Sequence, residues 1–234
     1  MLIQAINDMP KTKKIKLILR EKMIKKDLLI KKVKEQLPKI NIKLIKSQTK
    51  GQASTCLLGL EKNDLQNPLL ISACDNGVIY DYQKFKTLTK DDSIDIIVWG
   101  SRNYPGALKN PEMYGWIKEK DNIVEKVFVK QVYKDPATDP VLIGTFYFKK
   151  AEFFKRSAEY LIKSNETVNN EFYVDSSINK AINLGFKVAY FEVDFYLCCG
   201  TPNDLKTFNY WQNCFHKWES HMYKKYLDED YSIN

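Results

Sequence analysis

Strand-like and helix-like segments alternate through the first third of this chain, and the alternation limits the folds that the chain can adopt. Residues 13–19 read as a strand, 21–36 place apolar side chains among lysines as an amphipathic helix does, and a second strand is expected at 41–46. A helix that opens near Gly51 and a buried strand over 68–73 continue the series. Such alternation is typical of right-handed βαβ units. We therefore predict an α/β fold in which helices flank a mixed, mostly parallel sheet.

The second half of the chain changes to consecutive strands, which mixes antiparallel pairs into the sheet. We expect strands at about 94–99, 114–118, 123–131, 141–148 and 187–197, and helices at 149–163, 171–184 and 203–226. The chain contains no internal repeat and no convincing linker. We therefore predict one domain over residues 1–234, in which 213–234 form a C-terminal helical extension.

The formal net charge of +8 is compatible with nucleic acid or with phosphorylated small molecules as partners. Most of the lysine excess lies in the first fifty residues, where lysines interleave with Ile and Leu at helix and strand spacing. That pattern is typical of a solvated face. Because no helix-turn-helix, RNP or zinc pattern accompanies it, we predict no nucleic-acid partner.

Cysteine usage and hydropathy indicate the compartment. The five cysteines include no CxxC pair, which favours reduced thiols in a cytosol. The N-terminus lacks a signal-peptide core, and no run approaches the roughly 20 apolar residues that span a bilayer. We expect a soluble, cytoplasmic protein without membrane insertion.

Asp75 is the strongest single candidate for chemistry. It stands just past the C-terminal end of the strand over 68–73, the position at which ligands collect in open α/β sheets. Mg²⁺ commonly takes one or two protein carboxylates and completes its shell with water and phosphate oxygens, so Asp75 suits it. An Asp-Asn-Gly turn is an equally good explanation of Asp75-Asn76-Gly77 by itself.

Seven short segments, spread over most of the chain, match one pattern when they are taken together. They are Thr49-Lys50-Gly51-Gln52-Ala53; Pro68-Leu69-Leu70-Ile71 with Asp75; Tyr114-Gly115-Trp116; Lys130; Ile143-Gly144-Thr145-Phe146; Val168-Asn169-Asn170-Glu171-Phe172-Tyr173-Val174-Asp175; and Gly200-Thr201-Pro202-Asn203-Asp204-Leu205. No single segment is specific, but seven in order resemble the sugar-phosphate nucleotidyltransferase family. The resemblance implies a Rossmann-like fold of the nucleotide-diphospho-sugar transferase type.

The resemblance also implies an activity and a set of site residues. In the expected reaction, a phosphate oxygen of the acceptor attacks the α-phosphorus of a nucleoside triphosphate and pyrophosphate leaves. Mg²⁺ is the implied cofactor, with Asp75 as metal ligand and catalytic residue beside Lys130, which would bind the incoming phosphate. The implied nucleotide contacts are Thr49, Gly51, Gln52, Cys74 and Asp75. The implied acceptor contacts are Gly115, Lys130, Gly144, Asn169 and Glu171.

The expected acceptor is a sugar phosphate or a similar phosphorylated molecule. The product would serve cell-surface polysaccharide such as capsule or lipopolysaccharide. A glycosyltransferase is disfavoured, because Asn76 and Gly77 follow Asp75 where Asp-x-Asp would be expected.

The chain departs from the family at its N-terminus. Family members begin with a strand, a Gly-rich loop that carries an Arg, and a Pro-Lys pair, whereas Met1-Leu2-Ile3-Gln4 matches the following crossover helix. We therefore expect an N-terminally truncated domain whose first strand is missing. Its open sheet edge would invite association into a homo-oligomer.

A second departure concerns the metal. Cys198 stands where the family often has another metal-binding Asp, so Asp75 would act alone or with a ligand such as Asp194. Three interpretations stay open. The chain is a nucleotidyltransferase that is inactive as given if the missing loop is indispensable, its site is completed by another polypeptide, or it is a non-catalytic subunit that binds sugar phosphate or nucleotide.

Overall fold

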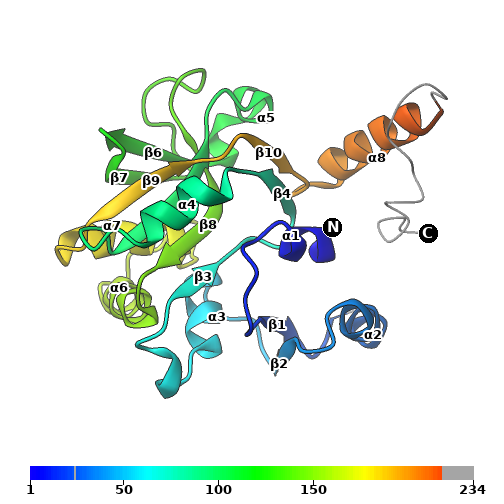
Figure 1. The fold of residues 1–234 in the computed structure, drawn as a ribbon, viewed down its shortest axis with the longest axis horizontal. Helices are drawn as coiled ribbons and strands as arrows, with labels where there is room; N and C mark the ends of the chain where they lie inside the picture. Colours follow the sequence, from blue (N-terminus) through cyan, green and yellow to red (C-terminus); the bar gives the residue numbers. More distant parts are fainter. Residues whose placement is uncertain (24, 218–234) are drawn as a thin grey trace.

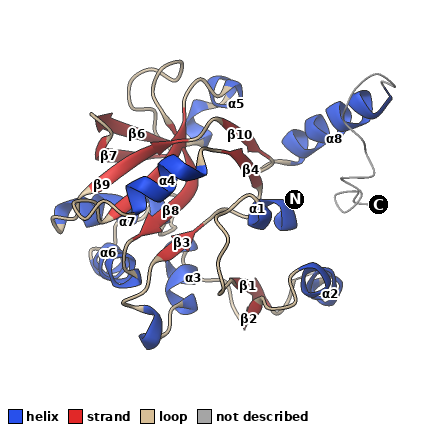
Figure 2. Cartoon of the chain, viewed as in Figure 1, coloured by secondary structure: helices blue, strands red, loops and turns tan. Residues whose placement is uncertain are grey.

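The structure is a computed structural model that describes residues 1–23 and 25–217. A six-stranded sheet forms its centre, and two smaller pairs of strands lie beside it (Figure 1). Helices cover the central sheet, which Figure 2 shows in red. The molecule is therefore a mixed α/β protein, as predicted.

The described helices are α1 (Leu2–Asn7), α2 (Lys26–Gln36), α3 (Gln52–Gly59), α4 (Tyr82–Thr89), α5 (Pro105–Lys109), α6 (Ala151–Lys163), α7 (Val174–Asn183) and α8 (Pro202–Lys217), with short 3₁₀ turns η1 (Lys62–Asp64) and η2 (Pro111–Met113). The described strands are β1 (Lys16–Arg20), β2 (Asn41–Ile45), β3 (Leu69–Ile71), β4 (Asn76–Ile79), β5 (Ile96–Ser101), β6 (Gly115–Lys120), β7 (Ile123–Val129), β8 (Val141–Phe148), β9 (Val188–Glu192) and β10 (Phe195–Cys198). None of the described helices has the length and apolar composition that crossing a membrane requires.

The central sheet has the strand order β3-β8-β5-β9-β7-β6. Strand β6 also pairs with the first residues of β8, through Gly115–Leu142 and Trp116–Val141. Strand β7 meets β9 at Ile123–Ala189. The pairings β8-β5-β9-β7-β6-β8 therefore close into a ring, and β3 extends β8 outside it.

The prediction of a mostly parallel sheet is wrong for the described strands. Only β5–β9 and β1–β2 pair in parallel, while β3–β8, β5–β8, β6–β7, β6–β8, β7–β9 and β4–β10 are antiparallel. The turn between β6 and β7 gives one reason. Asp121 and Asn122 both have left-handed backbone, with φ of 51° and 61°, as a tight hairpin requires. Antiparallel neighbours need only such a turn, whereas parallel neighbours need a long crossover.

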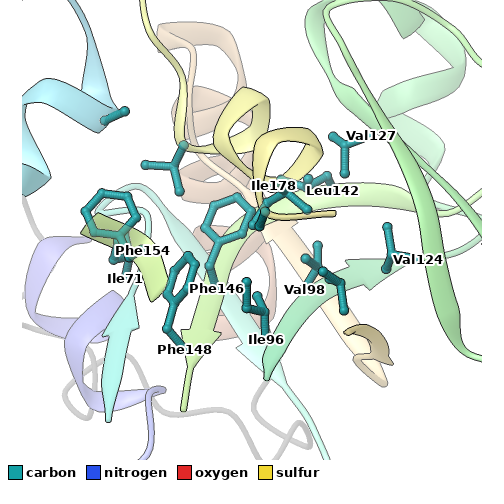
Figure 3. Close-up of a cluster of buried hydrophobic side chains, with 14 of the residues drawn as sticks. Ile71, Ile96, Val98, Val124, Val127, Leu142, Phe146, Phe148, Phe154 and Ile178 are labelled. Carbon is teal, nitrogen blue, oxygen red and sulfur yellow. The ribbon is translucent and has the colours of Figure 1, made fainter. Parts of the chain in front are cut away.

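Two apolar clusters cover the two faces of the central sheet. On β5, Ile96 and Val98 face one cluster and Ile97 and Trp99 the other, because successive side chains of a strand point to opposite faces. The first cluster packs against α3, α6 and α7, and Figure 3 shows its aromatic centre around Phe146. The second cluster packs against α4 through Phe85, whose ring centroid lies 4.9 Å from that of Trp99. With both faces covered, β5 is buried along its whole length.

Several expected boundaries are confirmed. Strand β8 coincides with the expected 141–148, and β1, β2, β5, β6, β7 and α6 overlap their expected segments. Two helices and one strand were not predicted, α4, α5 and β4. Helix α4 has a recognisable start, since the Asp81 side chain accepts hydrogen bonds from the backbone nitrogens of Gln83 and Lys84 at 2.8 and 3.0 Å.

Two other expectations need correction. The expected strand 187–197 is two strands, because the chain leaves the central sheet after β9 and β10 pairs with β4 instead. The expected helix 171–184 begins only at Val174, for a reason given below. The part of the 203–226 helix and of the 213–234 extension beyond residue 217 lies outside the described residues.

The N-terminal strands form a sheet of their own. Strand β1 pairs in parallel with β2, from Lys16–Asn41 to Arg20–Ile45. Within the described residues, β1 has no other strand partner and β3 pairs only with β8. Lys16 ties β1 to the segment after α3, because its Nζ donates to the Gly59 carbonyl at 2.7 Å and to Asp64 at 2.9 Å.

Candidate functional site

A cavity of about 1330 Å³ opens beside the central sheet. The loop after β3, the start of β6, the middle of β8, the end of β10, and helices α5 and α8 contribute to its walls. Five of the predicted site residues line it: Gln52, Asp75, Gly115, Lys130 and Gly144. The other five lie outside its lining: Thr49, Gly51, Cys74, Asn169 and Glu171. The fold therefore brings together residues from segments far apart in the chain.

A second cavity of about 490 Å³ lies between α1, the β4–β10 pair and α8. Its walls are mostly apolar side chains such as Ile79, Phe195 and Phe208. It holds none of the predicted site residues, so the first cavity is the candidate site.

The loop between β3 and β4 holds Asp75 at the cavity wall. The Cys199 backbone nitrogen donates to the Asp75 carbonyl at 2.8 Å, which ties this loop to the end of β10. The next residue, Asn76, is buried, and its side-chain nitrogen donates to the Ile143 carbonyl at 2.7 Å. These two bonds fix the loop from both sides while the Asp75 carboxylate stays partly exposed.

The donor set around Asp75 limits how a metal could bind. The described residues contain no group of three or more His, Cys, Asp or Glu side chains placed to hold an ion. Mg²⁺ does not need such a group, because one or two carboxylates with water and substrate phosphates complete its shell. Asp75 fits that requirement as a single carboxylate.

The two alternatives for a second ligand differ in their position. Cys198 pairs with Asn76 at the cavity end of β10, and its Sγ accepts a hydrogen bond from the Gly200 nitrogen at 3.4 Å. Asp194 lies at the other end of β10, where its backbone nitrogen donates to the Ile79 carbonyl. With about 3.3 Å per residue along a strand, that end is too far away for Asp194 to share an ion with Asp75.

Lys130 ends β7 and lines the cavity. Its backbone is left-handed, with φ of 54°, and the strand ends at Val129, two residues earlier than predicted. Its ammonium donates to the Met113 carbonyl just before β6. The hydrogen bond to Met113 therefore joins the end of β7 to the residues before β6, and both Lys130 and Met113 line the cavity.

Sequence reasoning gave Asp175 no role of its own, and the structure places it in the cavity. It lies in the first turn of α7, and a Cβ built on Gly115 would be 3.0 Å from its Oδ2. Burial raises the pKa of Asp175 to about 6, and its own backbone amide and the nearby Lys130 ammonium lower the pKa by less. No pattern in the sequence singles out Asp175, because its position beside Gly115 becomes visible only in the folded chain.

Gly51 serves the protein's own packing. Its φ is +116°, and a Cβ on it would lie 2.5 Å from the Phe172 backbone nitrogen. The Phe172 nitrogen donates to the Lys50 carbonyl at 2.7 Å, and the Ala53 nitrogen donates to the Phe172 carbonyl at 2.9 Å. These two backbone hydrogen bonds hold the start of α3 against Phe172, and Gln52, the first residue of α3, lines the cavity.

Thr49 also has a partner within the chain. Its hydroxyl donates to the Gly51 carbonyl at 2.9 Å and lies 2.6 Å from the Thr55 hydroxyl. These bonds stabilise the start of α3. Cys74 is exposed at the start of the Asp75 loop, outside the cavity lining.

Asn169 and Glu171 belong to a tight turn before α7. Asn169 and Asn170 have φ of 50° and 62°, and Val168 and Glu171 exchange backbone hydrogen bonds at 2.9 and 3.0 Å. Two left-handed residues between paired neighbours are typical of a type I′ turn, for which Asn is well suited. This turn delays the helix to Val174. The predicted helix began at Glu171, but Glu171 lies before the first turn of α7. The acceptor contacts assigned to Asn169 and Glu171 stay predictions.

The segment Gly200–Leu205 caps a helix. The Thr201 nitrogen and hydroxyl donate to the Asp204 carboxylate at 3.1 and 2.7 Å, and the Asp204 nitrogen donates back to the Thr201 hydroxyl at 3.2 Å. With Pro202 at the first helical position, this arrangement is a capping box that starts α8. Asp204 lines the cavity, but its carboxylate is engaged in this cap.

Three tyrosines form a polar wall of the cavity. The Tyr104 ring centroid lies 5.8 Å from that of Tyr114 and 4.7 Å from that of Tyr196, in edge-on arrangements. Burial raises the pKa of all three hydroxyls above the usual value. The wall therefore offers neutral hydroxyl groups that can both donate and accept hydrogen bonds.

Comparison with known proteins identifies the fold. No family model matches the sequence, and no curated protein resembles it enough to count as a match. Among solved structures, the nucleoside-diphosphate-sugar pyrophosphorylase from Vibrio cholerae superposes with a TM-score of 0.66 at 18% identity, over 83% of this chain and 80% of that one. The inositol-1-phosphate CTP transferase from T. maritima gives a TM-score of 0.62 at 16% identity, over 85% and 75%.

A third structure supports the same conclusion. The putative glucose-1-phosphate thymidylyltransferase from Bacillus anthracis, solved with sucrose, gives a TM-score of 0.62 at 14% identity, over 84% of this chain and 75% of that one. The chain thus has the fold of sugar-phosphate nucleotidyltransferases, which is the fold that its sequence segments predicted.

Proposed function

We propose that this protein is a nucleotidyltransferase that transfers a nucleoside monophosphate from a nucleoside triphosphate to a sugar phosphate or similar phosphorylated acceptor, with release of pyrophosphate. One observation carries the proposal. In a fold shared with enzymes of this kind, Asp75, Lys130 and Gln52 line a single cavity, although they come from segments far apart in the chain. Chance placement of unrelated residues would not be expected to collect them there.

The residues suggest a division of labour. Asp75 would hold Mg²⁺, which when bound neutralises charge on the phosphates of the nucleotide. Lys130 would bind the acceptor phosphate and orient its oxygen in line with the α-phosphorus. Gly144 is partly exposed at the cavity wall, and its missing side chain would let the acceptor lie close to the backbone. Gly115 also lines the cavity, but it is buried, and Asp175 lies beside the position that its Cβ would take.

Charge in the cavity limits the proposal. Among the described lining residues, Lys109 and Lys130 are the cationic side chains. A nucleoside triphosphate and an acceptor phosphate together carry more negative charge than Mg²⁺ and two lysines neutralise, and preorganised cationic groups supply much of phosphoryl-transfer catalysis. This observation keeps the second candidate in view, a non-catalytic subunit that binds sugar phosphate or nucleotide.

The test is a pyrophosphate-release assay with Mg²⁺ on this chain and on a chain extended by the in-frame upstream sequence. Four nucleoside triphosphates and a panel of phosphorylated acceptors should be tried with each. We expect activity that Asp75→Ala abolishes. Asp194→Ala is the matched control, because it removes a carboxylate at the far end of β10 and should leave activity intact. Binding of acceptor without turnover in either chain would favour the non-catalytic subunit.

The wider role follows from the proposed product. A nucleotide-activated sugar would be made in the cytoplasm and used by a sugar-transfer reaction, and we propose capsule or lipopolysaccharide synthesis as its destination. Association into a homo-oligomer belongs to the same proposal. Light scattering on the purified chain would test the oligomer independently of activity.

A further inference from the structure

The protein's positive charge is concentrated in one short segment. Residues 11–50, the basic segment, contain 15 Lys and Arg residues against three Asp and Glu residues. The basic segment therefore carries a net charge of +12, and the other residues together carry −4, since the whole chain carries +8. In the structure this segment forms β1, α2 and β2, and none of its described residues lines either cavity. Its charge therefore needs an explanation outside the candidate site.

Little of this charge is neutralised by the protein itself. Within residues 1–23 and 25–217, ion pairs engage only Lys14, Lys16 and Lys26 of the 14 lysines in the basic segment. The other eleven lysines are exposed. Like charges gathered on one surface repel one another, and an approaching anionic surface relieves that repulsion. The basic segment is therefore suited to an extended anionic partner.

Helix α2 presents part of this charge around an exposed leucine. Leu28 is 51% exposed, whereas Val33 is buried and anchors the helix. Positions three and four apart are neighbours on a helix surface, so Lys31 and Lys32 flank Leu28 on one side, and Lys25 at the N-cap precedes it by three positions. Figure 1 shows α2 at the edge of the molecule, beyond the β1–β2 pair. The outer face of α2 therefore offers an apolar side chain among cations.

An anionic bilayer surface fits both features of this face. Lysines clustered on an amphipathic helix are attracted to negatively charged headgroups. An exposed apolar side chain among them can enter the boundary between headgroups and acyl chains. Lys25, Lys31 and Lys32 outweigh Glu35, the acidic residue two turns beyond Leu28 on the same face. Such contact requires no element that crosses the bilayer.

The composition of the basic segment favours a bilayer over a nucleic acid. Residues 11–50 contain no Phe, Tyr, Trp or His, whereas the whole chain has 12 Phe, 14 Tyr and 4 Trp. Aromatic side chains are the usual stacking platforms for unpaired bases. The segment has a single Arg, Arg20, although Arg makes the commonest specific contact with base pairs. Lysine, a compact and strongly hydrated charge, needs only a diffuse negative surface.

We propose that the outer face of α2, with Leu28 among Lys25, Lys31 and Lys32, is a peripheral binding site for a bilayer that contains anionic phospholipids. This face is solvated in the free protein, and its contact with the bilayer is reversible, since one apolar side chain gives weak anchoring. Each lysine held near an anionic surface contributes about fivefold to binding, so the lysines supply most of the affinity. The inference does not depend on the proposed function, because α2 lies outside the candidate site.

The test is flotation of the full chain with vesicles. Vesicles of phosphatidylcholine mixed with phosphatidylglycerol are compared with vesicles of phosphatidylcholine alone, at low and at high salt. We expect binding to the anionic vesicles only, and weaker binding at high salt because ions screen the attraction. Replacing Lys25, Lys31 and Lys32 together by Gln should lower the partition coefficient at least about tenfold. Leu28→Ser, which leaves the charge unchanged, should lower it about threefold.

The matched control replaces Lys84, Lys86 and Lys90 together by Gln. These three exposed lysines lie on α4 and at its C-cap, so the control variant has the same net charge as the α2 variant. It should bind anionic vesicles as tightly as the unaltered chain does. An equal loss in the two triple variants would show that net charge alone drives the attraction, and would overturn the inference.

Three other results would also overturn it. The first is equal binding to the anionic and the neutral vesicles, and the second is no binding to either. The third is displacement of the protein from anionic vesicles by duplex DNA at the same concentration of phosphate groups, which would favour a nucleic-acid partner instead. Leu28→Ser keeps the test valid if the triple lysine variant changes the fold, and far-ultraviolet circular dichroism of each variant checks the fold directly.

Discussion

The backbone of Gly51 lies directly against the backbone of Phe172. No side chain separates them, because a Cβ on Gly51 would lie 2.5 Å from the Phe172 nitrogen and 2.7 Å from its oxygen. Two hydrogen bonds, from the Phe172 nitrogen to Lys50 and from the Ala53 nitrogen to Phe172, close the contact. This contact fixes the start of α3 against the segment that leads into α7, and so places two walls of the cavity relative to each other.

Gly51→Ala should therefore destabilise the fold strongly. The added methyl group meets backbone atoms, which cannot rotate away, and the left-handed φ adds its own cost, so we expect a loss of about 3 kcal/mol. Gly185→Ala is the matched control. Gly185 also has a positive φ, of 86°, but nothing lies within 4 Å of the position of its Cβ. Its loss should be about 1 kcal/mol in urea unfolding. Equal losses in the two variants would show that the contact with Phe172 contributes nothing.

The fold could be predicted where the local pattern and the packing agree. Strand β8 was placed at its observed bounds because aromatic and β-branched residues alternate between two buried faces. Helix α7 was started too early because Glu171 reads as a helical residue, whereas Asn169 and Asn170 make a turn whose left-handed φ values no periodicity reveals. The sheet was expected to be mostly parallel because helices alternate with strands in the first third of the chain. That expectation was wrong because most strands of the central sheet come from later in the chain, where several strands follow one another.

The candidate site divides in the same way. Asp75 and Lys130 could be named because family-like segments surround them in the sequence. Asp175 could not, since an acidic residue at a helix start has an ordinary explanation, and only the pairing of β6 with its neighbours places it under Gly115. The ligand contacts assigned to Thr49 and Gly51 stay predictions, and both residues also make contacts within the chain.

A partly exposed ionic network around Asp64 should make the stability of the fold depend on pH in the acid range. Asp64 accepts Lys14 and Lys16 at 2.6 and 2.9 Å, and these bonds lower its pKa from 3.8 to about 2. A lowered pKa in the folded state contributes stability above pH 4, which is lost as the pH falls toward 2. After allowance for partial exposure, we expect Asp64→Asn to lower the free energy of unfolding by about 1 kcal/mol at pH 7. The variant should also lose less stability than the unaltered protein as the pH falls below about 4. Asp27→Asn, at an exposed position, should change stability by less than about 0.5 kcal/mol. An unchanged acid limb in Asp64→Asn would contradict the assignment.

Asp175 should have the opposite effect on the pH dependence of stability. Burial raises its pKa from 3.8 to about 6, so the folded state binds more protons than the unfolded state between those values. Its contribution is complete below pH 4 and is lost as the pH rises through 6, to the extent of a few kcal/mol, about 3 at most. Asp175→Asn cannot ionise and should remove this decline. The measurement is urea unfolding of both proteins from pH 4 to 8, and parallel curves for the two would rule the shift out. Burial also raises the pKa of Asp8, so only the difference between the two curves is assigned to Asp175.

Lys130→Met should separate acceptor binding from nucleotide binding. The variant keeps the length of the side chain but removes the charge that would hold the acceptor phosphate, and loss of a charge-assisted hydrogen bond corresponds to about 10-fold or more in KM for the acceptor. The KM for the nucleoside triphosphate should change much less, because Asp75 and Gln52 lie in other segments of the cavity wall. Lys126→Met is the matched control, since Lys126 is exposed on the same strand and lies over the Phe128 ring outside the cavity. Removing Lys130 should also raise the pKa of Asp175 further, because its ammonium is one of the groups that lower it. Kinetics that change equally for both substrates, or equally in the two lysine variants, would place the acceptor phosphate elsewhere.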